Sequence, residues 1–257
     1  MTDDERPMGV LDAPNEGREL HATIGGVVYA RHPVRTHLVT AADDAVEVVA
    51  RSIGNAGADA RLVAVSERMV AITQGRSYPI RDIRPGRLAR LLERFVTRPG
   101  YGIGLGSAET MELAIREVGA PRILLAAAVS AVTKPFGIHG MFYRVAGPQA
   151  KAIDGPTSYT IPPYNVAATL GPKDPDGAAR AIAAAVGAPV AVIDANDAGC
   201  AVLGISPGVD RRLVQRLFAD NPLGQAREQT PICLVREVAW PDGRELPPEP
   251  RRRLTPP

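Results

Sequence analysis

The sequence predicts a mixed α/β (α+β) protein, because short β-branched runs alternate along the chain with stretches whose apolar residues recur at helical spacing. Size is a second observation: 257 residues, 45% of them hydrophobic, can bury a large core, which excludes a disordered protein. Both ends of the chain lack the alternation of β-branched runs and helical stretches. We therefore expect a folded body over residues 21–240, a disordered N-terminal tail over residues 1–20 and a tail rich in Pro and Arg over residues 241–257.

The expected strands are short apolar runs bounded by Gly, Pro, Asn or Asp. They cover residues 27–29, 35–39, 62–65, 69–73, 142–145, 190–194, 200–203 and 232–236. An acidic turn separates the runs at 190–194 and 200–203, which predicts that these two strands form a hairpin.

The expected helices have apolar side chains three and four residues apart and capping residues at their ends. They cover residues 43–54, 88–95, 107–118, 121–133, 176–186 and 210–218. Asp44 and Ser107 should begin two of them, and Asp174 followed by Pro175 a third. The helix from Pro121 is almost wholly apolar, so we expect it to be buried.

Charge and cysteine content narrow the function classes. The formal net charge is only +2, from 30 basic and 28 acidic residues, which excludes the strong positive field of a nonspecific nucleic-acid binder. Cys200 and Cys233 cannot by themselves form a disulfide framework or a zinc site. The most apolar stretch, Ile123 to Val132, is too short for a membrane span of about 18 residues, and the acidic N-terminus does not resemble a secretory signal. We expect a cytoplasmic protein whose partners are small molecules or a second copy of itself.

The densest acidic segment follows the apolar run at 190–193. Asp194, Asn196 and Asp197 precede Gly199, and hard oxygen ligands gathered in this way suit Mg²⁺ or Mn²⁺. The alternative is an ordinary turn in which Asn and Asp side chains bond their own backbone.

A glycine loop precedes the helix at 107–118. Gly102, Gly104 and Gly106 alternate before Ser107, and bare amides at a helix start attract phosphate. The loop has neither the dinucleotide-binding spacing nor the Lys and Ser/Thr of a Walker loop. A glycine-kinked segment beneath a packed helix is the alternative.

Two further segments carry polar side chains suited to chemistry. Lys134 follows the apolar helix and precedes a Pro-Phe-Gly turn, a placement that suits a lysine gripping phosphate, or a cation at a helix end. The Pro-rich segment at 154–175 contains Asp154 and Asn165 and lacks regular patterning, as functional loops often do. Gln225 and Gln229 lie in a polar loop that is either solvated or beside a site.

Several motifs in this order resemble the coenzyme F420-0:L-glutamate ligase (gamma-glutamyl ligase) family over about Thr36 to Arg236. The matching segments are Ser66-Glu67-Arg68, Gln74-Gly75-Arg76, Asn165-Val166, Gly171-Pro172-Lys173-Asp174-Pro175-Asp176, Asn196-Asp197-Ala198-Gly199 and Thr230-Pro231-Ile232-Cys233-Leu234-Val235-Arg236.

The resemblance implies a homodimer with a two-lobed gamma-glutamyl-ligase-like fold, mixed sheets and flanking helices. It implies an amide ligase in which GTP phosphorylates a substrate carboxylate and the amine of L-glutamate attacks the acyl phosphate, with Mg²⁺ or Mn²⁺ present. Carried over by position, the nucleotide contacts would be Thr36, His37, Leu38, Val39, Ser66, Glu67, Asn165, Gln225 and Gln229. The metal contacts would be Asn196 and Asp197.

The chain also departs from the family pattern. Asp154 stands well before Asn165, although the family has an Asp-x-x-Asn-Val turn. The family's Asp-Thr pair is Asn196-Asp197, with Asp194 as a substitute ligand, and Cys200 replaces an arginine. We expect a divergent branch using GTP or ATP, in which Asp154 or Glu67 accepts the proton of the attacking amine. The alternatives are a ligase for a different acid and a non-catalytic nucleotide-binding or regulatory relative.

Overall fold

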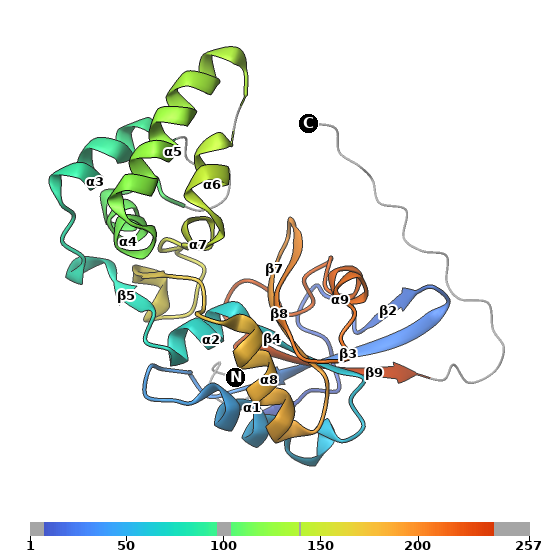
Figure 1. Ribbon diagram of the computed structural model, residues 1–257. Helices are drawn as coiled ribbons and strands as arrows, with labels where there is room; N and C mark the ends of the chain where they lie inside the picture. Colours follow the sequence, from blue (N-terminus) through green and yellow to red (C-terminus); the bar gives the residue numbers. More distant parts are fainter. Residues whose placement is uncertain (1–7, 97–103, 139, 239–257) are drawn as a thin grey trace.

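The computed structural model describes residues 8–96, 104–138 and 140–238. It consists of two lobes, one built on a large sheet and one almost entirely helical (Figure 1). The prediction of a mixed α/β protein is confirmed. No helix in these ranges is long and apolar enough to cross a membrane.

A seven-stranded mixed sheet forms the centre of the first lobe. Its strands follow the order β1-β3-β9-β4-β7-β8, and β2 pairs with β3 as well. Only β4 and β7 pair in parallel, and the other neighbours are antiparallel. The strands are β1 (Gly9–Val10), β2 (His21–Ile24), β3 (Val27–Arg35), β4 (Leu62–Ser66), β7 (Val190–Asn196), β8 (Gly199–Ile205) and β9 (Ile232–Val238).

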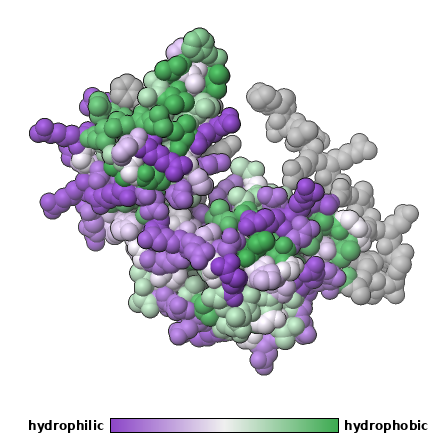
Figure 2. Space-filling model, in the orientation of Figure 1, coloured by the Kyte–Doolittle hydropathy of each residue, from purple (hydrophilic) through white to green (hydrophobic). Residues whose placement is uncertain are grey.

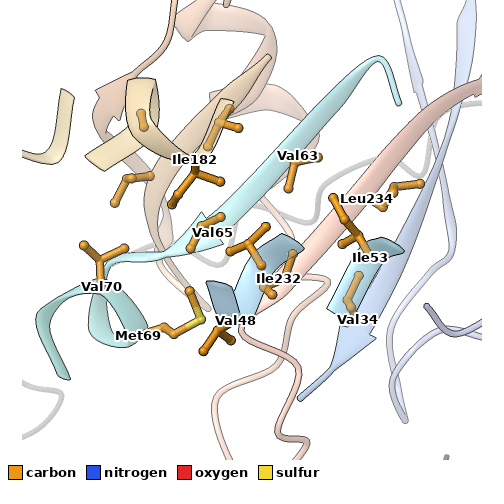
Figure 3. Packing of buried hydrophobic residues seen from close by; sticks show 14 of the residues in the cluster. Val34, Val48, Ile53, Val63, Val65, Met69, Val70, Ile182, Ile232 and Leu234 are labelled. Carbon is orange, nitrogen blue, oxygen red and sulfur yellow. The ribbon is translucent and has the colours of Figure 1, made fainter. Parts of the chain in front are cut away.

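Helices cover both faces of this sheet, because its central strands are apolar on both sides. Val63 and Val65 of β4 face helices α1 (Ala45–Ile53) and α8 (Pro175–Val186), in the cluster that Figure 3 shows. The alternate residues of the same strand pack with α9 (Arg211–Leu217) on the opposite face. The predicted strands at 62–65, 190–194, 200–203 and 232–236 are therefore confirmed, as is the hairpin of β7 and β8.

The predicted helix caps are confirmed where the structure describes them. The Asp44 carboxylate accepts from the backbone N–H groups of Val46 and Glu47 at the start of α1. Asp174 accepts from Gly177 N at 2.9 Å, which satisfies an amide that the first turn of α8 leaves without a partner.

The second lobe is a small helical bundle with its own apolar core. It is connected to the first lobe through a two-stranded sheet of β5 (Ser77–Pro79) and β6 (Ala167–Thr169). Its helices are α3 (Arg87–Leu92), α4 (Ala108–Val118), α5 (Ala120–Thr133), α6 (Met141–Ala146) and α7 (Pro148–Lys151).

The prediction of a disordered tail over residues 1–20 is wrong from Met8 onward. β1 pairs with β3, and the buried amide of Asn15 donates to the carbonyls of Pro222 and Leu223 at 3.1 and 3.0 Å. The segment is polar in sequence yet packed, because long-range hydrogen bonds hold its backbone. Residues 1–7 and the predicted tail at 241–257 lie outside the described ranges.

Two predicted strands are helices instead. Residues 69–73 belong to α2 (Glu67–Thr73), and residues 142–145 belong to α6. Residues 69–73 form a short buried apolar run, whereas residues 142–145 combine the buried Phe142 with the exposed Arg144. Runs this short do not distinguish a strand from a helix. The strand predicted at 35–39 also fails, because β3 ends at Arg35 and residues 36–40 form a loop.

The expectation that the apolar helix from Pro121 is buried is wrong as well. Within α5, only Ile123 and Ala126 are buried, since α4 and α6 cover one side of it. Leu124, Leu125 and Val132 are 46%, 57% and 66% exposed.

Candidate functional site

Three strands that run in the same direction end at one edge of the sheet. β3 and β4 are each antiparallel to β9, and β7 is parallel to β4, so the carboxyl ends of β3, β4 and β7 point the same way. In sheets with parallel strands, ligands bind outside these ends. This topology brings Thr36, Ser66, Glu67 and Asp194 to one edge, although they are far apart in the sequence.

The start of β9 lies at the same edge and links these residues. The backbone N–H of Ser66 donates to Pro231 O at 2.8 Å, and that of Thr36 donates to Gln229 O at 3.2 Å. Gln229 adopts a left-handed conformation, with φ of 59°. Thr36, Ser66 and Gln229, which the family resemblance assigns to nucleotide contacts, are thus neighbours.

Asp154 reaches this edge from the segment that connects the two lobes. Its backbone forms a two-way bridge with Thr169, both N···O distances being 2.9 Å. Its carboxylate forms an ion pair with Arg68, which also donates to Thr160 Oγ1 at 3.3 Å. The Arg68–Asp154 pair therefore connects the first turn of α2 with the Pro-rich segment.

Two carboxyl groups at this edge, Glu67 and Asp194, have raised pKa values. Burial raises the pKa of Glu67 well above its ordinary value, and the negative charges of Asp194 and Asp154 raise it further. Burial also raises the pKa of Asp194, with a further contribution from Asp154, while Asn196, Arg68 and Lys151 act in the opposite direction. Like charges gathered in a low-dielectric region favour a bound proton or a bound cation.

The carboxylates at this edge suit a divalent cation that is also bound by the phosphate oxygens of a substrate. Magnesium in proteins is commonly held by one or two carboxylates together with phosphate oxygens of the substrate. Asp194 lies near the end of β7 and close to Glu67, so Asp194 together with phosphate oxygens would hold it. Within the described ranges, no group of three or more His, Cys, Asp or Glu side chains is arranged to hold a metal ion without such help.

Asp197, predicted as a metal ligand beside Asp194, has partners of its own. Its carboxylate accepts from Arg18 at 3.0 Å and from Asn221 at 3.4 Å. Partial burial acts to raise its pKa, but hydrogen bonds from Arg18, Asn221 and Gln225 outweigh this and lower it. The metal role of Asp197 stays a prediction, and Gln225 lies beside Asp197.

Asn196 forms the hydrogen bonds of an Asx turn, which is the alternative to a metal site at this segment. Its side-chain oxygen accepts from Ala198 N at 2.9 Å, and its amide donates to Asp194 Oδ1 at 3.3 Å. Asn196 therefore orients Asp194 while its own oxygen is already engaged.

The loop after β3 is tied to the segment that carries Asn165. Tyr164 donates its hydroxyl to Val39 O at 2.7 Å, next to the half-buried Asn165. His37 Nε2 lies 2.8 Å from Asp43 Oδ1, and Leu38 stands between His37 and Val39. The family-implied nucleotide contacts at 36–39 and 165 thus belong to one connected region.

None of the described contacts links the glycine loop to this edge of the sheet. Ser107 caps α4 in a reciprocal capping box with Thr110, and Leu105 is fully buried in the helical lobe. Gly104 and Gly106 flank Leu105, whereas Gly102 lies outside the described ranges. The packing alternative accounts for Ser107, and a phosphate contact for the loop stays a prediction.

Lys134 is also remote from the sheet edge. It is exposed and begins a short 3₁₀ turn after α5, at the tip of the helical lobe far from the sheet (Figure 1). Most of the apolar helix before it is exposed or half-buried, so Lys134 does not extend from a buried segment.

Sequence reasoning missed two cations that act at the sheet edge. Arg68 pairs with Asp154, and Lys151 lies close enough to Asp194 to lower its pKa. Arg68 stands in the family-like Ser66-Glu67-Arg68 motif, so its position was a usable signal. Lys151 ends α7 only three residues before Asp154, and lysine is rare in this chain.

Cys200 lies beside Asp194 but is not activated. Burial and the negative charge of Asp194 raise the pKa of its thiol to about 12, which keeps it protonated at neutral pH. Because the thiolate is the nucleophile, Cys200 is not suited to covalent chemistry.

No model of a known protein family matches the chain, and no curated protein matches it either.

Proposed function

We propose that this protein is a nucleotide-dependent amide ligase of the cytoplasm. In this proposal it activates a carboxylate as an acyl phosphate, using GTP or ATP, and couples it to the amine of an amino acid, with L-glutamate as first candidate. The observation that supports the proposal best is the convergence of Thr36, Ser66, Glu67 and Asp194 at one sheet edge, close to the Arg68–Asp154 pair.

The charges at this edge suit the two chemical steps. In the first step, a carboxylate oxygen attacks the γ-phosphorus, the bond to the bridging oxygen breaks, and the nucleoside diphosphate leaves. Arg68 and Lys151 are the cations available to balance the negative charge that gathers on the phosphoryl group. A bound Mg²⁺ or Mn²⁺ would supply further charge neutralisation there.

In the second step, the amine attacks the acyl carbon and inorganic phosphate leaves. The amine must lose a proton, and a buried carboxyl group with a raised pKa can hold such a proton at neutral pH. Glu67 meets this requirement, since it is nine-tenths buried and has two acidic neighbours. Asp154 is already paired with Arg68, so Glu67 is the better candidate base.

The decisive experiment measures phosphate release from GTP and from ATP, with Mn²⁺, coenzyme F420-0 and L-glutamate each added or omitted. Release that requires both the acid and the amino acid supports the ligase. Asp194→Asn should abolish this release, whereas Asp82→Asn, at an exposed ion pair with Arg81 in the 3₁₀ turn after β5, should leave it intact. Failure to bind either nucleotide would refute the proposal.

One observation favours a second candidate, a nucleotide-binding relative without ligase activity. Asp197 is engaged by Arg18 and Asn221, so it is held away from the role of a free metal ligand. Nucleotide binding by the wild-type protein, without phosphate release for any tested acid, would favour this alternative.

A further inference from the structure

The helical lobe and the rest of the chain have opposite net charges. Residues 80–153 contain eleven basic and five acidic residues, whereas the rest of the chain contains 19 basic and 23 acidic residues. The whole-chain charge of +2 is thus the sum of a basic lobe and an acidic remainder. Such an asymmetry is typical of proteins that bind anionic surfaces.

Four arginines of α3 and the turns beside it are exposed: Arg84, Arg87, Arg90 and Arg94. Leu91, which is 52% exposed, lies four residues after Arg87 and three before Arg94, so these three side chains share one helical face. Among the described residues, the ion pairs of arginines within this lobe involve Arg81 and Arg116, not these four. The positive charge of α3 is therefore presented to the solvent.

The same lobe exposes an apolar surface on α5 and the turn after it. Five large side chains there are between 46% and 79% exposed: Leu124, Leu125, Val132, Phe136 and Ile138. Figure 2 shows apolar surface over this upper part of the lobe, with hydrophilic side chains projecting beside it. The segment 119–153, which contains this surface, has four basic residues and no acidic one. The apolar surface thus lies in a basic environment.

An anionic lipid bilayer accommodates both features at once. Aliphatic side chains enter the boundary between headgroups and acyl chains, while guanidinium groups are attracted to the lipid phosphates. A nucleic acid would pair with the arginines, but aliphatic side chains such as Leu125 and Val132 offer its bases no stacking surface. A second copy of this chain would bring two basic lobes together, and these repel each other. The combination of charges and apolar side chains therefore favours lipid.

We propose that the helical lobe binds reversibly to an anionic membrane surface. The end of α5 and its turn enter the interfacial layer, and the arginines of α3 add attraction from the same lobe, since α4 packs against both α3 and α5. An arginine contributes without touching a headgroup, because this attraction extends over a Debye length of about 10 Å at 0.1 M salt. The inference does not depend on the proposed ligase activity.

Co-sedimentation of the full chain with lipid vesicles tests this inference. Binding to vesicles of phosphatidylcholine and phosphatidylglycerol, in a ratio of about three to one, should be at least about tenfold stronger than binding to phosphatidylcholine alone, because the positive charge of the lobe acts on the anionic lipid. Raising NaCl from about 0.1 M to about 0.5 M should weaken binding by a similar factor, since salt screens this attraction.

Two variants separate the charges from the apolar contact. Arg87→Gln/Arg90→Gln should weaken vesicle binding about thirtyfold, from a loss of about fivefold for each arginine. The matched control, Arg180→Gln/Arg212→Gln, removes the same charge from exposed positions of the first lobe and should change binding less than about threefold. Leu125→Gln should weaken binding about fivefold, because a half-exposed leucine no longer leaves water. Thermal melts check that each variant remains folded.

Several outcomes would overturn the proposal. One is a wild type that does not bind the anionic vesicles, and another is an equal loss in the two arginine pairs, which would mean a response to net charge alone. Full binding by Leu125→Gln would place the apolar surface away from the lipid. Binding to duplex RNA in place of vesicles would assign the arginines to a nucleic acid. A wild-type dimer that Leu125→Gln dissociates would assign the apolar surface to a second copy.

Discussion

The two lobes differ in how they use residues that the sequence marks as functional. At the sheet edge, residues from four distant segments converge, because three strands end together and a fourth begins there. In the helical lobe, Ser107 caps a helix and Lys134 lies at a distant tip. Chemistry-bearing residue types therefore indicate a site only where the topology brings several of them together.

The contrast also concerns burial. The sheet edge contains a deeply buried carboxyl group, Glu67, with acidic neighbours, whereas the helical lobe exposes large apolar side chains such as Phe136. The first arrangement is costly for a protein that does not use it. The second is costly only for a chain that stays alone in water. This contrast supports the proposal of ligand chemistry at the sheet edge.

The largest expected effect separates the two aspartates of the predicted metal turn. Asp194→Asn should weaken Mn²⁺-dependent nucleotide binding by about a hundredfold, because it removes a half-buried carboxylate from the edge where the strands converge. Asp197→Asn should act mainly on the melting temperature, since it breaks the contact with Arg18. Isothermal titration calorimetry and thermal melts on both variants check this. Equal losses of affinity would show that both residues serve the metal, as the sequence predicts.

The next effect compares the lysines of the two regions. Lys151→Met should weaken nucleotide binding by about tenfold, since it removes a cation that acts on Asp194. Lys134→Met should change affinity by less than about twofold, because Lys134 is exposed at the tip of the helical lobe. Calorimetry with the same nucleotide measures both. A larger loss of nucleotide affinity for Lys134→Met than for Lys151→Met would support the phosphate contact that the sequence predicts for Lys134. The helical lobe would then also take part in nucleotide binding.

Local sequence patterns were sufficient to predict much of the fold. Strands β4, β7 and β9 each begin with four consecutive apolar residues, and Asp44 and Asp174 cap their helices as predicted. The failures have a common physical cause, since burial in a core is a property of the whole fold. The apolar runs in α2 and α6 carry no sign of their helical state, and the apolar surface of α5 gives no sign of being left uncovered.

The site was predictable residue by residue but not as an arrangement. The acidic turn and the Ser66-Glu67 motif are visible in the sequence, whereas their convergence requires knowing that β4 and β7 are parallel neighbours. Arg18 was missed because its segment is polar and rich in turn residues, which composition cannot distinguish from a loose tail. Its contact with Asp197 spans 179 positions of sequence, beyond the reach of any local pattern.

The smallest effect concerns the protonation of Glu67. Its pKa is raised in the folded protein, so the folded state binds more protons than the unfolded state between the unfolded value, about 4.3, and the raised one. The free energy of unfolding should therefore fall as pH rises through this window. Glu67→Gln mimics the protonated acid and removes this dependence.

Thermal melts between about pH 4 and pH 9, with EDTA to remove cations, measure the difference between the two proteins. Near pH 4 the variant and the wild type should melt at similar temperatures. As pH rises, Glu67→Gln should become the more stable by a few degrees, about 2–4 °C for each 1 kcal/mol of relieved charge burial. Burial of Asp194 raises its pKa with the same sign, and this burial is present in both proteins, so its contribution cancels from the comparison. A melting-temperature difference independent of pH would mean that Glu67 ionises as an exposed acid does, and the edge of the sheet would then lose its distinction from the helical lobe.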